Sequence, residues 1–310
     1  MVRVSGILPI KNGDQWIARS LPRILANLDS EDELIVIDDG SSDLSYKLVM
    51  SFAESDSRIK LHRTKGVGLV ESLNLGISES ISEWVARFDI DDFYSRDRLK
   101  MQKENIDESL VAIFSDYQIL HNGKSNLGII PSPITDSATR LSLLRSQRTA
   151  HPSALIRKSS LIKVGGYLQS EYPAEDLGLW TRLAEVGMLT SIPLVGLYYN
   201  MRAGSISREN KNLIAQKREI ILNAFIKVLD MDYVYSNLEK TIDTYKKLER
   251  GRERTLLHYW DLTHSQSQKL LEKARRRDVK RRLGLAVSNP LNYVANTNLM
   301  YYRYLRKLYK

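Results

Sequence analysis

The chain alternates between two patterns of apolar and polar residues over positions 1–205. Short runs of consecutive apolar residues are typical of strands that are buried on both faces of a sheet. Between these runs, apolar residues recur every three or four positions, which is typical of amphipathic helices. The order predicts an α/β fold with a Rossmann-like, mostly parallel central sheet and helices on both faces. The predicted strands are Val4–Ile10, Leu34–Ile37, Ile59–His62, Trp84–Phe88, Val111–Ser115, Ala154–Arg157 and Pro193–Tyr199.

The predicted helices lie between these strands and beyond them. Since the sequence contains no internal repeat and no long Gly-, Ser- or Pro-rich linker, we expect a C-terminal helical extension to pack against the first domain. In that extension one helix face is predicted from Ile214, Ile220, Ile221, Ala224 and Val228, and another within Leu238–Leu248. The earlier helices are predicted from Asp14 to Leu28, over Leu44–Ala53, over Leu69–Ile77 and over Asp176–Val186.

The distribution of charge divides the chain near residue 205. Positions 1–205 carry 23 Lys and Arg against 26 Asp and Glu, whereas positions 206–310 carry 23 against 11, a net charge of +12. We therefore expect one domain over 1–205 and a basic helical region over 206–310. A basic surface attracts nucleic acid, anionic lipid or anionic glycan, and charge alone does not choose among them.

The last part of the basic region has an amphipathic pattern. Two polybasic runs, Arg275–Arg277 and Lys280–Arg282, precede apolar residues that recur at helical spacing from Leu291 to Tyr309. Such a segment suits an anionic membrane surface, and the alternative is a helix packed on the first domain with a solvated charged face. We expect no nucleic-acid partner, because no recognised nucleic-acid-binding module accompanies the charge.

Composition excludes several kinds of site. Without cysteine the chain forms no disulfide, thiolate metal site or cysteine nucleophile. No apolar run is long enough to span a bilayer, and Val4–Ile10 is too short and interrupted for a secretory signal. We expect a cytoplasmic protein, located at the inner face of the membrane if its basic tail binds there.

Polar loops follow three of the predicted strands, at Pro9–Asn12, Asp38–Asp43 and Asp89–Asp92. In open α/β sheets, ligands bind beyond the carboxyl ends of the strands. The last loop places three carboxylates within four residues, and they would repel one another without a cation. Hard oxygen ligands suit Mg²⁺ or Mn²⁺, metals that commonly act on a diphosphate. The alternative is an acidic loop that simply faces water.

Taken together, the motifs resemble glycosyltransferase family 2. The segments Val4–Gly13, Glu33–Asp43 and Asp89–Asp92 follow the order and spacing of that family. The resemblance covers roughly residues 4–205. It implies a GT-A fold and the transfer of a sugar from a nucleotide donor with inversion at the anomeric carbon. The later matches are Lys65-Gly66-Val67-Gly68-Leu69 with Asn74 and Gly76, His151-Pro152-Ser153, Gly165-Gly166-Tyr167, and Glu175-Asp176 with Trp180.

The resemblance implies a nucleotide site in the first loops. An acid equivalent to Asp39 recognises the base, and a carboxylate suits the imide N–H of uracil, which favours a UDP-sugar. The alternative for Asp38–Asp43 is a hydrated turn that caps a helix. Arg202 lies in a segment that resembles the family's mobile loop and would bind phosphate oxygens, or it is a surface arginine at a domain junction. The other candidates for nucleotide binding are Pro9, Lys11, Asn12, Lys65 and Asp89.

Asp91 is the main candidate ligand for Mn²⁺ or Mg²⁺. Asp89, two residues away, lies on the same face if the strand stays extended, and would hold ribose or assist the metal. Asp92 is the alternative ligand. A metal here would bridge the diphosphate and stabilise the charge that develops on the leaving nucleotide.

Asp176 is the candidate catalytic base. The reaction needs a carboxylate that accepts the proton of the acceptor hydroxyl while that oxygen attacks the anomeric carbon. Its predicted place at a helix N-terminus favours the ionised form, although acids in first turns are also simple helix stabilisers. Glu175 is the alternative base or a group that binds the acceptor. His151 is expected, from the resemblance, to shape the acceptor cleft.

These features predict a metal-dependent, inverting hexosyl- or N-acetylhexosaminyl-transferase that acts on a glycan or lipid-linked acceptor in cell-surface polysaccharide or glycolipid synthesis. A sugar nucleotidyltransferase would carry a Gly-rich basic loop after its first strand, which Pro9–Gly13 does not provide. A degenerate, non-catalytic scaffold is the third hypothesis, and the joint presence of Asp39, Asp91 and Asp176 speaks against it. The sequence lacks the Gln-x-x-Arg-Trp motif of processive members, so addition of single sugars is expected.

Overall fold

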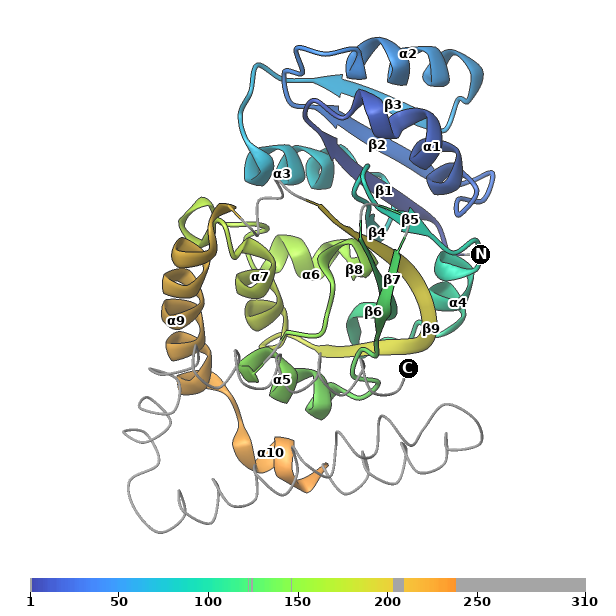
Figure 1. The fold of residues 1–310 in the computed structure, drawn as a ribbon. Coiled ribbons are helices and arrows are strands. Elements are labelled where there is room, and N and C mark those ends of the chain that lie inside the picture. The colour runs from blue at the N-terminus through green and yellow to red at the C-terminus, as the bar shows by residue number, and fades with distance from the viewer. Residues whose placement is uncertain (1, 122, 124, 146, 203–208, 238–310) are drawn as a thin grey trace.

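The computed structural model of the protein describes residues 2–121, 123, 125–145, 147–202 and 209–237. The predicted helix within Leu238–Leu248 and the basic tail from Arg275 onward lie outside the described residues. Figure 1 shows the arrangement of the elements.

The N-terminal part alternates strands and helices, and every one of its elements confirms a predicted element. The strands begin and end within a residue or two of the predicted runs because charged or polar residues lie next to most of their ends. The elements are β1 (Val4–Ile10), α1 (Asp14–Leu25), β2 (Glu33–Asp38), α2 (Ser45–Ser55), β3 (Ile59–Arg63), α3 (Leu69–Glu79) and β4 (Trp84–Arg87).

The following part contains more elements than the pattern predicts. The predicted strands correspond to β6, β8 and β9, but β6 and β9 continue through polar residues and are longer than expected. β5, β7, α4, α5 and α6 are not predicted. The elements are β5 (Phe93–Tyr94), α4 (Arg98–Glu104), β6 (Leu110–His121), β7 (Ser125–Ile130), α5 (Asp136–Arg145), β8 (Leu155–Arg157), α6 (Lys158–Lys163), α7 (Glu175–Leu183), β9 (Met188–Met201), α9 (Lys211–Val228) and α10 (Met231–Ser236).

One sheet organises these elements, with the strand order β3-β2-β1-β4-β8-β6-β9-β5, and β7 pairs with β6. The neighbours β3, β2, β1 and β4 pair in parallel, and so do β6 and β9. β8 is antiparallel to both β4 and β6, so it reverses direction in the middle of the sheet. The carboxyl ends of β1, β2 and β4 therefore share one edge, where the sequence places its acidic loops.

Helices cover both faces of the sheet, as predicted. The side chains of Leu8 and Val36 pack against Ile17 and Leu21 of α1 in one core. Their neighbours in sequence, Ile7 and Ile35 among them, point the opposite way because strand side chains alternate. That second core also contains Leu73 of α3 and Trp180 of α7. The alternation explains why β1 and β2 have apolar residues at consecutive positions.

The helix α9 packs beside α7 and completes the second core (Figure 1). Its buried residues are Ile221, Leu222 and Phe225. The helix itself confirms the prediction, but the predicted face is wrong, since Ile220 and Val228 are 66% and 54% exposed. Within the part of the chain that the structure describes, no helix is both long and apolar enough to cross a bilayer.

Candidate active site

The loops after β1 and β2 are tied together at the edge of the sheet. The backbone N–H of Asp39 donates to the carbonyl of Ile10 at 2.8 Å, and the backbone N–H of Asn12 donates to the Ser41 hydroxyl at 2.9 Å. The Asn12 side chain in turn accepts a hydrogen bond from the backbone N–H of Ser42 at 2.9 Å. Asn12 adopts a left-handed backbone conformation with φ of 52°, which Asn tolerates better than most residues. Pro9 and Lys11 are therefore held beside the Asp39 loop.

Asp39 organises the loop that leads from β3 to α3. Its Oδ1 accepts hydrogen bonds from the Thr64 hydroxyl at 2.6 Å and the Val67 N–H at 2.7 Å, and its Oδ2 accepts one from the Gly68 N–H at 3.1 Å. Lys11 Nζ lies 3.4 Å from the same Oδ2. Burial alone would raise the pKa of Asp39, but these hydrogen bonds lower it below its ordinary value. Asp39 is therefore an ionised carboxylate, and the exposed Lys65 lies within the loop that it holds.

The three carboxylates after β4 have three different partners. Asp89 Oδ1 accepts a hydrogen bond from Arg87 at 2.7 Å, and Asp91 Oδ2 accepts one from Arg202 Nε at 2.6 Å. Asp92 Oδ1 accepts one from the backbone N–H of Asn200 in β9 at 2.7 Å. The side chains of Asp89 and Asp91 are 32% and 21% exposed, whereas that of Asp92 is almost completely buried.

Burial and charge act together on this group of acids. Burial, and then the charge of Asp89, raise the pKa of Asp91, while the hydrogen bond from Arg202 acts in the opposite direction. Burial, followed by the charges of Asp89 and Asp91, raises the pKa of Asp92 well above its ordinary value. Among the described residues, no group of three or more His, Cys, Asp or Glu side chains is arranged to hold a metal ion. Asp89 and Asp91 are the members of the run that present carboxylates to solvent.

Arg87, at the end of β4, is a buried cation beside these acids. Its side chain is 3% exposed and donates hydrogen bonds to Asp89 Oδ1 and to the Phe88 carbonyl. Burial opposes its charge, but the neighbouring Asp89 carboxylate raises its pKa above the ordinary value for arginine. In the sequence, Arg87 lies inside an apolar strand pattern, which gives no indication of a functional role.

The pair Glu175 and Asp176 opens α7. Asp176 Oδ1 accepts a hydrogen bond from the backbone N–H of Leu177 at 2.7 Å, and its Oδ2 accepts one from Gln147 Nε2 at 2.5 Å. Glu175 is 7% exposed, and its Oε2 is buried without a hydrogen-bond partner among the described residues. Burial, and then the charge of Asp176, raise the pKa of Glu175 to about 7.

Several groups around Asp176 favour its ionised form. Burial raises its pKa, but the Leu177 N–H, the charge of Arg218 and the Gln147 side chain act in the opposite direction. Two adjacent carboxylates with separated pKa values can divide the roles of proton acceptor and hydrogen-bond donor. The hydrogen bonds from Leu177 and Gln147 hold the Asp176 carboxylate, whereas Glu175 Oε2 has no such partner among the described residues.

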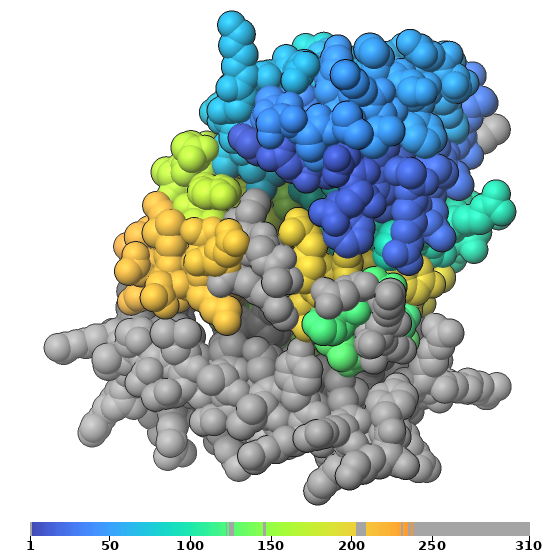
Figure 2. All heavy atoms as spheres, turned by 45° about the horizontal axis from the view of Figure 1, so that its top comes forward, coloured from blue at the N-terminus to red at the C-terminus, as the bar shows by residue number. Residues whose placement is uncertain are grey.

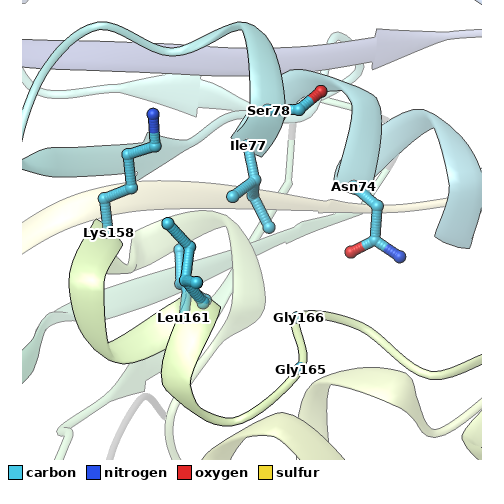
Figure 3. A pocket seen from close by; sticks show the side chains of 8 residues that line it. Asn74, Ile77, Ser78, Lys158, Leu161, Gly165 and Gly166 are labelled. Carbon is cyan, nitrogen blue, oxygen red and sulfur yellow. The ribbon is translucent and has the colours of Figure 1, made fainter.

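The distant motifs His151, Gly165-Gly166-Tyr167 and Asn74 meet beside this pair. Asn74 Nδ2 donates to the Tyr167 carbonyl and Asn74 Oδ1 accepts from the Tyr167 N–H, both at 2.9 Å. A Cβ atom at Gly166 would lie 2.6 Å from Asn74 Oδ1, and Gly166 has a φ of +65°, so the turn requires glycine. Figure 3 shows Asn74 beside this turn, at one end of a cavity of about 320 Å³ between α3 and α6. The two hydrogen bonds between Asn74 and Tyr167 connect α3 to the Gly165–Tyr167 turn, which brings these distant motifs together.

Tyr167 is a buried residue that lies beside His151 and near charged groups of both β4 and α7. Its hydroxyl lies 2.7 Å from His151 Nε2. Burial raises the pKa of Tyr167, the charge of Arg87 lowers it, and the charges of Glu175, Asp176 and Asp89 raise it further. Charged groups at the end of β4 and at the start of α7 therefore both act on this tyrosine. Sequence reasoning assigned no separate role to Tyr167, because its partners are distant along the chain.

Gln147 and Arg218 are further residues that sequence reasoning missed. Gln147 lies in the segment between α5 and β8, and Arg218 is one of several cations on α9. Neither position is marked by a motif or by apolar spacing, so a single sequence carries no signal for them.

The comparison with protein families identifies the class of the chain. Residues 5–165 match the family model described as "Glycosyl transferase family 2". Because the match extends over more than half of the 310 residues, the chain belongs to this family.

Several curated proteins are similar to the chain in sequence. It is 24% identical over 191 residues to an uncharacterised glycosyltransferase of Rickettsia felis, across 61% of this chain and 31% of that protein. It is 27% identical over 179 residues to the UDP-Gal:alpha-D-GlcNAc-diphosphoundecaprenol beta-1,3-galactosyltransferase of Escherichia coli, across 56% of this chain and 64% of that protein. The chain spans less than a third of the length of the rickettsial relatives that it matches.

Two solved structures show the same fold. S. aureus TarS 1–349 in complex with UDP-GlcNAc has a TM-score of 0.57 at 20% identity and covers 73% of this chain and 72% of its own. The mannosyltransferase PcManGT of Pyrobaculum calidifontis, solved with GDP-Man and Mn²⁺, has a TM-score of 0.56 at 18% identity, over 96% and 87% of the two chains. The chain therefore has the GT-A fold that the sequence predicts.

Proposed function

We propose that the protein is an inverting glycosyltransferase that binds a nucleotide-sugar at the carboxyl ends of β1, β2 and β4. One observation carries this proposal. Arg87 and its partner Asp89, at the end of β4, act electrostatically on both Glu175 and the buried Tyr167, so leaving-group and acceptor sites would be adjacent. In this arrangement residues 1–205 form the catalytic domain, and residues 206–310 form the helical extension.

The donor is proposed to be a UDP-sugar. Asp39 is ionised and lies at the base of the first loops. There its carboxylate would accept a hydrogen bond from the imide N–H of uracil. Pro9, Asn12 and Lys65 would line the nucleotide site, and Lys11 would offset phosphate charge. The galactosyltransferase of Escherichia coli is named for UDP-Gal, and TarS has been solved with UDP-GlcNAc, which supports the same nucleotide here.

Asp91, assisted by Asp89, would hold Mn²⁺ or Mg²⁺. A pair of carboxylates fits these metals, which usually keep several waters and take their remaining ligands from substrate phosphates rather than from an all-protein cage. When bound, the metal would neutralise charge on the diphosphate. Asp92 fits this role less well, since it is buried against the backbone of Asn200. Arg202, now paired with Asp91, would contact phosphate oxygens when released from that carboxylate.

Asp176 would act as the base. The acceptor oxygen attacks the anomeric carbon and its proton passes to Asp176 Oδ2, while the bond to the diphosphate breaks and its electron pair leaves with the nucleotide. Glu175, with a pKa of about 7, is protonated for part of the time at neutral pH and would donate a hydrogen bond to the acceptor. Glu175 is the alternative base.

The acceptor is proposed to be a glycan or a lipid-linked sugar in cell-surface polysaccharide or glycolipid synthesis. The named relative of Escherichia coli acts on a diphosphoundecaprenol-linked sugar, which supports a lipid-linked acceptor for this chain. Association with the inner face of the membrane would bring the enzyme to such an acceptor.

Release of nucleotide from a panel of UDP-, GDP- and TDP-sugars tests this function. We expect release from a UDP-hexose or a UDP-N-acetylhexosamine, stimulated by acceptor and by Mn²⁺ and lost in EDTA. A donor panel without any turnover, combined with tight binding of UDP, would instead indicate a non-catalytic binding protein.

A further inference from the structure

The C-terminal extension reaches the proposed base through two hydrogen bonds. Arg218 of α9 donates from its guanidinium to Gln147 Oε1 at 2.9 Å, and Gln147 Nε2 donates to Asp176 Oδ2 at 2.5 Å. Arginine only donates hydrogen bonds, so its contact fixes the amide oxygen of Gln147 toward α9. The amide nitrogen must then point toward Asp176. Arg218 therefore donates to Gln147, and Gln147 donates to the Asp176 carboxylate.

The backbone at Gln147 is held in an unusual conformation. Its φ is +39°, in the left-handed region that side-chain-bearing residues rarely occupy. A hydrogen bond of 2.8 Å from the Gln147 N–H to the Ser142 carbonyl supports this turn. Such conformations persist only where the surroundings impose them. The turn directs the Gln147 side chain between α7 and α9.

The two helices that Gln147 connects are fixed relative to each other. Ile221, Leu222 and Phe225 of α9 share one core with Trp180 and Leu183 of α7. Arg218 lies one turn before these anchors, so its position relative to Asp176 is set by packed apolar side chains. In Figure 1, α9 runs beside α7. In Figure 2, the α9 segment (orange) and the N-terminal segment (blue) are both visible on the face that is turned to the viewer.

We infer that Gln147 and Arg218 are positioning residues that orient the Asp176 carboxylate for proton transfer, so that the helical extension completes the active site. The inference rests on the proposed function, in which Asp176 is the base. With Oδ1 held by Leu177 and Oδ2 by Gln147, the plane of the carboxylate is fixed from two elements. The charge of Arg218 also favours the ionised form against the effect of burial.

The alternative is a purely structural tie between α9 and α7. It predicts that loss of Gln147 or Arg218 lowers the melting temperature and changes activity only through the amount of folded enzyme. The positioning role predicts a change in the chemical step. Hydrogen bonds to a carboxylate lower its pKa, so their loss should raise the pKa of Asp176 and move the acidic limb of the kcat–pH profile to higher pH.

The experiment compares Gln147→Ala and Arg218→Met with the control Lys211→Met in the full chain. Lys211 is exposed on the same helix, so its substitution removes one positive charge from α9 away from Asp176. For both test variants we expect kcat to fall at least tenfold, about 1.4 kcal/mol of barrier, with the Kd of UDP within twofold of wild type. Arg218→Lys should recover part of the loss. The control should keep the wild-type profile.

A ¹³C-carboxyl NMR titration of Asp176, assigned through Asp176→Asn, adds a readout that needs no turnover. A higher pKa in Gln147→Ala supports the positioning role even if no donor is found. An unchanged acidic limb together with an unchanged Asp176 pKa overturns it. An inactive wild type would contradict the proposed function alone, because the NMR result would still decide the question of positioning.

Discussion

The carboxylates of the proposed active site differ in pKa because their hydrogen-bond partners and their burial differ. Asp39 and Asp176 both accept hydrogen bonds on both oxygens, yet hydrogen bonding lowers the pKa of Asp39 whereas burial raises that of Asp176. Glu175, with a buried oxygen that lacks a partner among the described residues, has a pKa raised to about 7. These differences suit Asp39 to a fixed negative charge and the Glu175–Asp176 pair to proton transfer.

Replacing the proposed base should abolish turnover and preserve donor binding. Asp176→Asn keeps the size of the side chain and removes its basicity, so we expect kcat to fall by more than about 100-fold, within the range for loss of a general base. The Kd of UDP, measured by titration calorimetry, should stay near the wild-type value. Asp97→Asn, at an exposed position before α4, is the matched control. Retention of more than about a tenth of the turnover would reject Asp176 and direct the same test to Glu175.

The raised pKa of Glu175 should appear as a dependence of stability on pH. The folded state binds a proton at Glu175 up to about pH 7, whereas in the unfolded chain this carboxyl has its ordinary pKa of 4.5. Stability from the neutral form is therefore present below pH 4.5 and is lost as the pH rises through 7.

Glu175→Gln removes this ionisation. Melting temperatures at pH 5 and pH 8 should show the variant gaining stability relative to wild type at pH 8, by at least ~2 °C if the gain is about 1 kcal/mol. An equal difference at both pH values would show that Glu175 does not titrate in this range.

At the scale of elements, the sequence predicts the part of the fold in which each strand has its own apolar run. β1, β2 and β4 are mostly apolar and buried segments, so their positions follow from the pattern, whereas β3 (Ile59–Arg63) alternates apolar and polar residues and is only partly buried. β5 has only two residues, and β6 and β9 pass through polar positions, so periodicity cannot define them. The antiparallel direction of β8 cannot be predicted from its three residues, because it depends on how β8 pairs with β4 and β6.

The site follows the same division. The positions of Asp39, Asp89 and Asp176 can be predicted from the sequence, because the first two follow a strand and the third opens a helix. The partners that fix these acids are distant in sequence, as with Asp92, whose side chain meets the backbone of Asn200 108 positions later. Such contacts arise from the curvature of β9 across the sheet, and local pattern carries no information about them.

The two neighbouring acids Asp91 and Asp92 should respond differently to substitution. Asp92→Ala leaves the buried N–H of Asn200 without its acceptor, which costs about 1–3 kcal/mol, so the melting temperature should fall. Asp91→Ala removes a partly exposed carboxylate, so it should change stability little while weakening UDP binding in the presence of Mn²⁺.

Calorimetric titration with UDP, in Mn²⁺ and in excess EDTA, measures the metal-dependent part directly. We expect EDTA to weaken binding to the wild type and to have little further effect on Asp91→Ala. Equal affinity in all four conditions would remove the metal from the proposed site. Strong metal-dependent binding that survives in Asp91→Ala but not in Asp92→Asn would assign the metal to Asp92.

At the scale of the whole molecule, the basic region contains two parts with different predicted roles. The helix α9 begins after residue 205, yet it buries Ile221, Leu222 and Phe225 in the core and reaches the proposed base through Arg218. A chain truncated after residue 205 should therefore expose apolar core surface and be insoluble or inactive. The charge boundary at residue 205 is thus a boundary of composition, and the packed unit continues at least through α9.

The remaining part of the basic region, with its polybasic runs at Arg275–Arg277 and Lys280–Arg282, has two alternative predicted roles: it binds an anionic membrane, or it packs on the catalytic domain. The first alternative has a direct test. The full chain should then sediment with anionic liposomes and be released by salt, because electrostatic attraction is screened over roughly 10 Å at ~0.1 M. Deletion of residues 285–310 should abolish sedimentation and leave donor hydrolysis intact, since the predicted catalytic acids and Arg218 all precede the deletion. If the tail instead packs on the catalytic domain, neither protein should bind liposomes and the truncated one should have a lower melting temperature. The two forecasts differ in both measurements because a membrane anchor is dispensable for folding, whereas the removal of a packed helix exposes the apolar surface that it covered.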